Sequence, residues 1–232
     1  MANLRDRGGV CLYRSRPDPP TLRPSDPPTV RPSDLQTFRP SDLPTDTPDV
    51  NPLRWCLLAL LSWWSIGFVT HPVDGNYIAG SFLHLVNLPF HEAGHILFSP
   101  FGTFLTAAGG SLLQLIIPIV CAVSLLRRDD HYGAAVCVWW AGQSLVDLAP
   151  YIADARALQL VLLGGRTGAE VEGHDWEAIL MSLGWMRYDR TLGAAAHWIG
   201  CLTMVSAIVA AGAMVWAATP RSDTGSALRP EV

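Results

Sequence analysis

Long apolar runs, separated by short polar or glycine-containing breaks, fill the chain between about residues 55 and 218. The longest of these runs are residues 55–71, 77–98, 111–126, 133–163 and 194–218. An α-helix of roughly 17 to 25 mostly apolar residues can cross the ~30 Å hydrocarbon layer of a bilayer. The pattern therefore predicts an all-α, polytopic membrane protein with about four to six transmembrane helices.

Proline and glycine mark two places where the helices should be interrupted. Pro89 lacks a backbone N–H inside the second run, which predicts a break near Asn87 and a new helix with His91 in its first turns. Residues 100–110 contain one proline, Pro100, and three glycines, Gly102, Gly109 and Gly110. This composition predicts a re-entrant loop packed against the helix that carries His91.

The two ends of the chain differ from this middle region. Residues 1–53 are rich in Pro, Ser, Asp and Arg, and an eight-residue repeat with the core Arg-Pro-Ser-Asp starts at Thr21, Thr29 and Thr37. Such a composition cannot bury an apolar core, so it predicts a disordered tail with some polyproline II character. The polar composition of residues 219–232 predicts a flexible tail. The membrane-embedded domain is therefore expected at residues 54–218.

Composition agrees with a membrane location and excludes some partners. Half of the 232 residues are hydrophobic, and nine are tryptophan. The net charge of −4 is small and spread along the chain, so no nucleic-acid partner is expected. We expect an integral, multi-pass protein of the plasma membrane of a bacterium, with the lipid bilayer as its surroundings. The sequence leaves the oligomeric state open.

One apolar run carries a motif with a definite chemistry, His91-Glu92-Ala-Gly-His95. On a helix the two histidines lie about one turn apart, so both imidazoles project from one face and can share a metal ion. Two neutral imidazoles and a third ligand hold Zn²⁺ and leave one position open for water. Zinc lowers the pKa of that water, and Glu92 is placed to take its proton as the general base.

The surroundings of the motif favour a functional site. Between residues 55 and 126 the only formally charged side chains are Asp74 and Glu92. A carboxylate in hydrocarbon costs several kcal/mol unless a partner or a metal compensates its charge. The alternative is a helix whose two histidines pair with neighbouring polar groups. His84, two turns before His91, is either a supporting group for the site or a core histidine with satisfied hydrogen bonds.

The third metal ligand is expected from one of two later segments. Asp147 and Asp154 interrupt the apolar run 133–163, and ionisable groups at membrane depth usually face a functional interior. Asp154 is the first choice as ligand, and pairing with Arg156 is its alternative role; Asp147 could orient a histidine. His174 is the alternative third ligand, just before a short amphipathic helix that Asp175 can cap.

These motifs resemble those of the site-2 protease-like family of intramembrane zinc metallopeptidases. In that family a His-Glu-x-x-His helix is followed, a few helices later, by a segment of the type Asn-x-x-Pro-x-x-Pro-Leu-Asp-Gly whose aspartate is the third ligand. The first motif is matched fully by residues 91–95. The second is matched loosely by Asp147-Leu-Ala-Pro150-Tyr-Ile-Ala-Asp154-Ala, which lacks the asparagine, the second proline and the glycine.

The resemblance implies a membrane-embedded zinc metallopeptidase in which His91, His95 and Asp154 hold Zn²⁺ and Glu92 is the general base. Its expected substrate is a transmembrane protein cut at a peptide bond in or near the bilayer. The residues by themselves predict a zinc hydrolase, and the peptide substrate comes from the resemblance. Two alternatives stay open: a non-proteolytic multi-pass protein that retains a structural metal site, and a zinc-dependent hydrolase of lipid amides.

Overall fold

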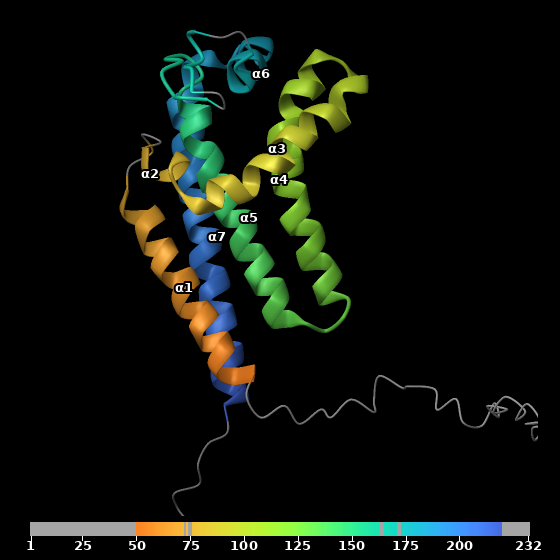
Figure 1. The fold of residues 1–232 in the computed structure, drawn as a ribbon, viewed down its shortest axis with the longest axis vertical. Coiled ribbons are helices and arrows are strands. Elements are labelled where there is room, and N and C mark those ends of the chain that lie inside the picture. The colour runs from red at the N-terminus through yellow and green to blue at the C-terminus, as the bar shows by residue number, and fades with distance from the viewer. Residues whose placement is uncertain (1–49, 72, 74–75, 163–164, 171–172, 220–232) are drawn as a thin grey trace, which may run out of the picture. The chain divides into compact units, whose positions relative to one another are not determined.

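A computed structural model describes residues 50–71, 73, 76–162, 165–170 and 173–219 (Figure 1). The predicted disordered tail at residues 1–53 lies outside the described residues except for its last four, which belong to the first helix. The predicted polar tail from residue 219 onward lies outside them as well, apart from Thr219 itself.

The described part of the chain is helical, as predicted. The helices are α1 (Val50–Thr70), α2 (Asn76–Ala79), α3 (Phe82–Phe98), α4 (Thr103–Leu126), α5 (His131–Ala153), α6 (Asp175–Leu183) and α7 (Asp189–Ala218), with short 3₁₀ turns at Ser99–Phe101 and Met186–Tyr188. Among the described residues, β-pairing is limited to an isolated bridge between Val161 and Thr167. The fold class is therefore all-α.

Three helical segments are long and apolar enough to cross a membrane: Pro52–Thr70, Thr103–Leu126 and Met186–Ala218. Their outer faces carry large apolar side chains that are mostly exposed, such as Trp63, Ile66, Leu202 and Trp216, each more than 60 % exposed. Rows of exposed apolar side chains of this size are unusual on soluble proteins. A lipid environment accounts for them, because the bilayer core is as apolar as the side chains.

The protein core lies where α5 packs along α7 (Figure 1), and side chains of α1 pack against both helices. Phe68, Trp139, Val146 and Met204 are the large buried side chains of this core. Polar side chains are buried beside this apolar core as well, since the buried residues of α5 include Gln143, Ser144 and Asp147. Buried polar and ionisable groups in membrane helices usually face a functional interior.

The expected glycine-rich re-entrant loop is a helix instead. The chain reverses at Ser99–Phe101 and at Gly102, whose φ of 95° suits glycine, and α4 then runs without a break through Gly109 and Gly110. These glycines let α4 approach α3 closely: a side chain at Gly94 of α3 would clash with the backbone of Gly109. Helix-to-helix contact therefore overrides the weak helix propensity of glycine.

The expected break in the second apolar run lies earlier than predicted. The helix ends after Ala79 and restarts at Phe82, where the Ser81 hydroxyl accepts the backbone N–H of His84 at 3.2 Å. α3 then continues through Pro89, and His91 lies in its middle rather than in its first turns. Asn87 does not mark a break. Its side chain hydrogen-bonds to residues of α5, and this contact anchors the helix at that point.

Candidate metal centre

Two imidazoles and one carboxylate converge where α3 meets the start of α6. Nε2 of His91 and Nε2 of His95 each lie 3.2 Å from Oδ2 of Asp175. These three residues are the cluster that could hold a metal ion among the described residues. The expectation that the two imidazoles share one face of a helix is confirmed, because both rings reach the same carboxylate oxygen.

The outer nitrogen of each ring is already engaged by a hydrogen-bond acceptor. Nδ1 of His91 lies 3.0 Å from Oε1 of Gln114, and Nδ1 of His95 lies 2.8 Å from the carbonyl oxygen of Thr106. Because a carbonyl oxygen only accepts, each Nδ1 must carry the proton, and Nε2 of a neutral ring then presents its lone pair. This is the tautomer that a metal-binding histidine needs, with the other N–H held by an oxygen.

Three electron-rich atoms therefore point at one another. Two Nε2 lone pairs and a carboxylate oxygen repel unless a cation or an added proton lies among them. Two imidazole nitrogens and a carboxylate oxygen are also a donor set that divalent transition metals accept. The chemistry of the donors thus fits a divalent cation.

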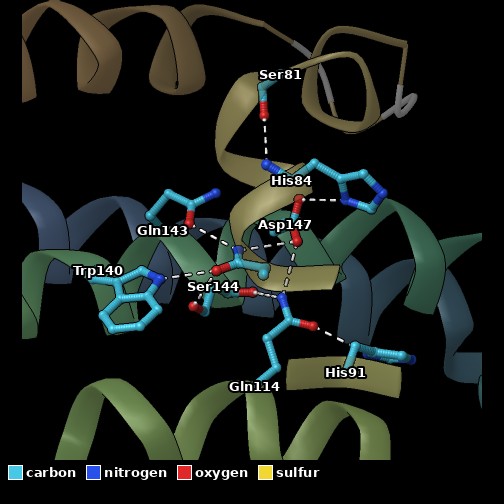
Figure 2. A network of polar contacts seen from close by, with 9 residues as sticks. Ser81, His84, His91, Gln114, Trp140, Gln143, Ser144 and Asp147 are labelled. Atoms are coloured by element: carbon cyan, nitrogen blue, oxygen red, sulfur yellow. Dashed lines mark hydrogen bonds and ion pairs between the residues drawn. The ribbon is translucent and has the colours of Figure 1, made fainter. Parts of the chain in front are cut away.

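The orientation of Gln114 is itself fixed by Asp147 on α5 (Figure 2). Nε2 of Gln114 donates to Oδ2 of Asp147 at 2.9 Å. Since a carboxylate only accepts hydrogen bonds, the amide NH₂ must face Asp147, and Oε1 must face His91. The carboxylate of Asp147 thereby sets the tautomer of His91 through one intervening side chain.

The same carboxylate holds two further groups on α3. Nδ1 of His84 donates to Oδ1 of Asp147 at 3.0 Å, so Asp147 does orient a histidine, as the sequence suggested. Nδ2 of Asn87 donates to Oδ2 of Asp147 at 3.1 Å, while its Oδ1 accepts the indole N–H of Trp140 at 2.9 Å. These hydrogen bonds offset the cost of burying the carboxylate of Asp147.

Glu92 lies beside the centre without a partner of its own. Its side chain is exposed, and among the described residues it forms no hydrogen bond or ion pair. It lines a cavity of about 530 Å³ together with His91, His95, Tyr151 and Asp175. A carboxylate that is free of other bonds and faces the same cavity as the candidate ligands is available to accept a proton.

Asp154, the predicted third ligand, lies outside the cluster of His91, His95 and Asp175. Asp154 follows the last residue of α5, and its two carboxylate oxygens accept the backbone N–H groups of Gln159 and Leu160 at 2.9 and 2.8 Å. The carboxylate therefore stabilises the turn after α5. Its alternative pairing with Arg156 is not formed either, since Arg156 bonds to Asp189 at 2.9 Å.

His174, the alternative third ligand, also has another role. Its Nδ1 accepts the backbone N–H of Glu177 at 3.2 Å and caps α6, while its Nε2 lies 3.7 Å from Oδ2 of Asp154. Burial lowers the pKa of His174 below its usual range, against the opposing effect of Asp154, Asp175 and Glu177. The ring is thus a neutral cap of the helix that presents Asp175.

Asp175 is not among the ligands that the sequence predicts, because there it looks like a helix cap. It is instead the first residue of α6, where a negative charge is favoured by the helix dipole. Trp176 anchors the same turn to α4, because its indole N–H donates to the hydroxyl of Ser111 at 3.1 Å. The feature of the sequence that could have pointed to Asp175 is its position, since it is a carboxylate at the start of a short amphipathic helix.

Gly110 of α4 packs directly against the two imidazoles of the centre. A Cβ atom at this position would lie 2.6 Å from Nε2 of His91 and 2.7 Å from Nε2 of His95. Real Cβ atoms do not approach other atoms so closely, so any side chain here would displace both rings. The space next to the two nitrogens therefore depends on glycine.

Comparisons of the chain with protein-family models, curated proteins and solved structures find no match. The resemblance to the site-2 protease-like family therefore stays an expectation that rests on residues 91–95 and on the looser second segment.

Proposed function

We propose that this protein is a membrane-embedded zinc metallopeptidase that hydrolyses a peptide bond in or near the bilayer. His91, His95 and Asp175 hold the zinc ion, and Glu92 is the general base. The observation that carries the proposal is the convergence of two imidazole Nε2 atoms on one carboxylate oxygen, with both Nδ1 atoms engaged elsewhere.

The choice of zinc follows from the donor set. Two histidines and one carboxylate form a common catalytic zinc site, in which a further position stays open. When bound, zinc acidifies a water ligand and polarises the carbonyl of the substrate. Asp175 and the two imidazoles fix the ion, and Glu92 accepts a proton in the cavity and returns it to the leaving amine.

The proposal includes the arrangement in the membrane. α5 adds a fourth crossing to the three apolar helices, because its buried polar side chains face the interior network and not lipid. α3 and α4 form a hairpin, which brings residues 91–95 into the membrane region together with the crossing helices. A multi-pass protein of a bacterial plasma membrane, acting on a transmembrane protein substrate, fits this arrangement.

The decisive experiment compares metal content and turnover in one variant. Protein purified without chelators should contain about one zinc ion per chain by mass spectrometry. Glu92→Gln should keep that zinc but lower turnover by about 10²- to 10⁴-fold, since only the proton acceptor is removed. Turnover is measured on a panel of fluorescent transmembrane peptides and a panel of lipid amides, both in liposomes.

Glu177→Gln is the matched control, because it makes the same change on α6 at a residue that does not line the cavity. It should leave zinc and turnover unchanged. Absence of zinc in the purified protein would overturn the proposal. Cleavage of lipid amides but not of peptides would replace it with a lipid amide hydrolase, and bound zinc without turnover on either panel would leave a structural metal site. Full activity of Glu92→Gln would overturn the role of Glu92 as the general base.

A further inference from the structure

Tyr151 of α5 faces the candidate metal centre, although no step of the proposed reaction uses it. It follows Pro150 in the segment where the sequence predicted the third ligand. Its side chain lines the cavity with Glu92 and Asp175, and its ring centroid lies 6.0 Å from that of His91. It is therefore close enough to the centre to act on it.

The phenol makes two hydrogen bonds to one residue, and the direction of each is fixed. The backbone N–H of Asp175 donates to the phenol oxygen at 3.0 Å. The phenol proton must then point elsewhere, and it lies toward Oδ2 of Asp175 at 3.0 Å. Tyr151 thus holds both the backbone and the carboxylate of Asp175.

Within the described residues, Tyr151 is the donor that holds this carboxylate. The other two groups near Oδ2 are the Nε2 atoms of His91 and His95, which act as acceptors in the tautomer fixed above. Without the phenol, the carboxylate of Asp175 could rotate about its side-chain bonds, and the backbone N–H of Asp175 would lose its acceptor.

The ring of Tyr151 is held in place from its other side. Its centroid lies 4.3 Å from the ring of His174, which is buried and bonded to the backbone of Glu177. The ring therefore cannot swing away from Asp175 without disturbing the start of α6. Tyr151 lies in the same segment as Asp154, and its ring packs against His174. The two segments in which the sequence predicted the third ligand therefore position the tyrosine that orients Asp175.

We infer that Tyr151 is a positioning residue for the metal centre, which fixes the carboxylate of Asp175 toward the two imidazoles. The inference rests on the proposed function, because it takes those three residues as zinc ligands. Groups that orient a metal ligand by a hydrogen bond typically change metal affinity by 10- to 100-fold when they are removed.

The test is the zinc affinity of the full chain in detergent, measured by competition with a chromophoric chelator. Tyr151→Phe removes only the hydroxyl and should weaken zinc binding by about 10- to 100-fold. Tyr132→Phe is the matched control: it lies on the same helix, and its hydroxyl donates to the carbonyl of Arg54 at 2.8 Å, away from the centre. It should leave the affinity unchanged.

A double-mutant cycle separates positioning from general loosening of the fold. In an Asp175→Ala background the phenol has no carboxylate to hold, so Tyr151→Phe should change zinc affinity by less than about twofold. An equal loss in both backgrounds would overturn the inference, as would an unchanged affinity of Tyr151→Phe in the otherwise wild-type chain. Failure of the wild-type chain to bind zinc would overturn the proposed function together with it.

The wild-type protein provides a second measurement if Tyr151→Phe does not fold. Zinc fixes the carboxylate that the phenol also holds, so adding zinc should slow amide hydrogen exchange at Asp175, whose N–H is bonded to Tyr151. Exchange at Asp175 that does not respond to bound zinc would overturn the inference and leave the zinc site itself intact.

Discussion

The contact between α3 and α4 and the contact between α5 and α7 are both built on glycine, yet they do different things. Where α5 meets α7, a side chain on Gly200 would lie 2.5 Å from the carbonyl oxygen of Gly142 and 2.7 Å from Val146. Where α3 meets α4, a side chain on Gly110 would meet two imidazole nitrogens. The first contact packs helices, and the second also leaves space next to the two imidazole nitrogens of the candidate centre.

This difference shows how one residue type serves two purposes in a helical membrane protein. Small residues let helix backbones approach closely, which gives van der Waals contact where no hydrophobic effect acts between helices. At Gly110 the same closeness places α4 against the open nitrogens of the histidines. Substitutions at the two contacts should therefore separate stability from metal binding.

The largest effect is expected at Gly110. In Gly110→Ala the methyl group occupies the space next to both Nε2 atoms, so zinc affinity should fall by about 100-fold or more, at an overpacking cost of roughly 1–3 kcal/mol. Competition with a chromophoric chelator measures the zinc affinity, and the helical content seen by circular dichroism shows whether the chain is folded. An unchanged zinc affinity of this variant would mean that the contact between α3 and α4, like the contact between α5 and α7, serves only to pack helices.

A smaller loss is expected where the histidine tautomer is set. Gln114→Leu removes the acceptor for Nδ1 of His91, so zinc affinity should fall by about 10- to 100-fold. Gln143→Leu is the control, because Gln143 bonds to Asn87 in the same network but does not contact His91. If both variants lost zinc to the same extent, the network would act through the fold and not through the tautomer.

The smallest effect on zinc is expected at the packing contact. Gly200→Ala should lower the free energy of unfolding by about 1–3 kcal/mol, because its methyl group overlaps the backbone of α5. Zinc affinity of the folded fraction should not change. Gly212→Ala, also on α7, meets only Leu58 at 3.5 Å and should change stability by less than about 0.5 kcal/mol. Thermal unfolding in detergent measures both.

The sequence predicted those features that depend on residues close together in the chain. Helices follow from long apolar runs, and the shared face of His91 and His95 follows from their spacing of four. The sequence predicts a loop for the glycine-rich segment at residues 100–110, because glycine disfavours an isolated helix. In the structure, residues 103–110 belong to α4. Its close contact with α3 decides its structure, and no local pattern reveals that contact.

The third member of the candidate site could not be predicted in the same way. Asp154 interrupts the apolar run 133–163, His174 and Asp175 follow it, and the spacing of these residues does not rank them. The choice depends on the hydrogen bonds each forms: Asp154 binds the backbone after α5, and His174 binds the backbone of α6. Only Asp175 is left facing the imidazoles. The binding of zinc itself stays a prediction.

The separation of 84 positions between His91 and Asp175 has a consequence for how the protein is made. Translation delivers both imidazoles early, while the carboxylate that completes the donor set follows only after α4 and α5 have been synthesised. A nascent or truncated polypeptide that stops before residue 175 thus has an incomplete centre. The ribosome therefore finishes most of the helical domain before the three side chains of the candidate centre can come together.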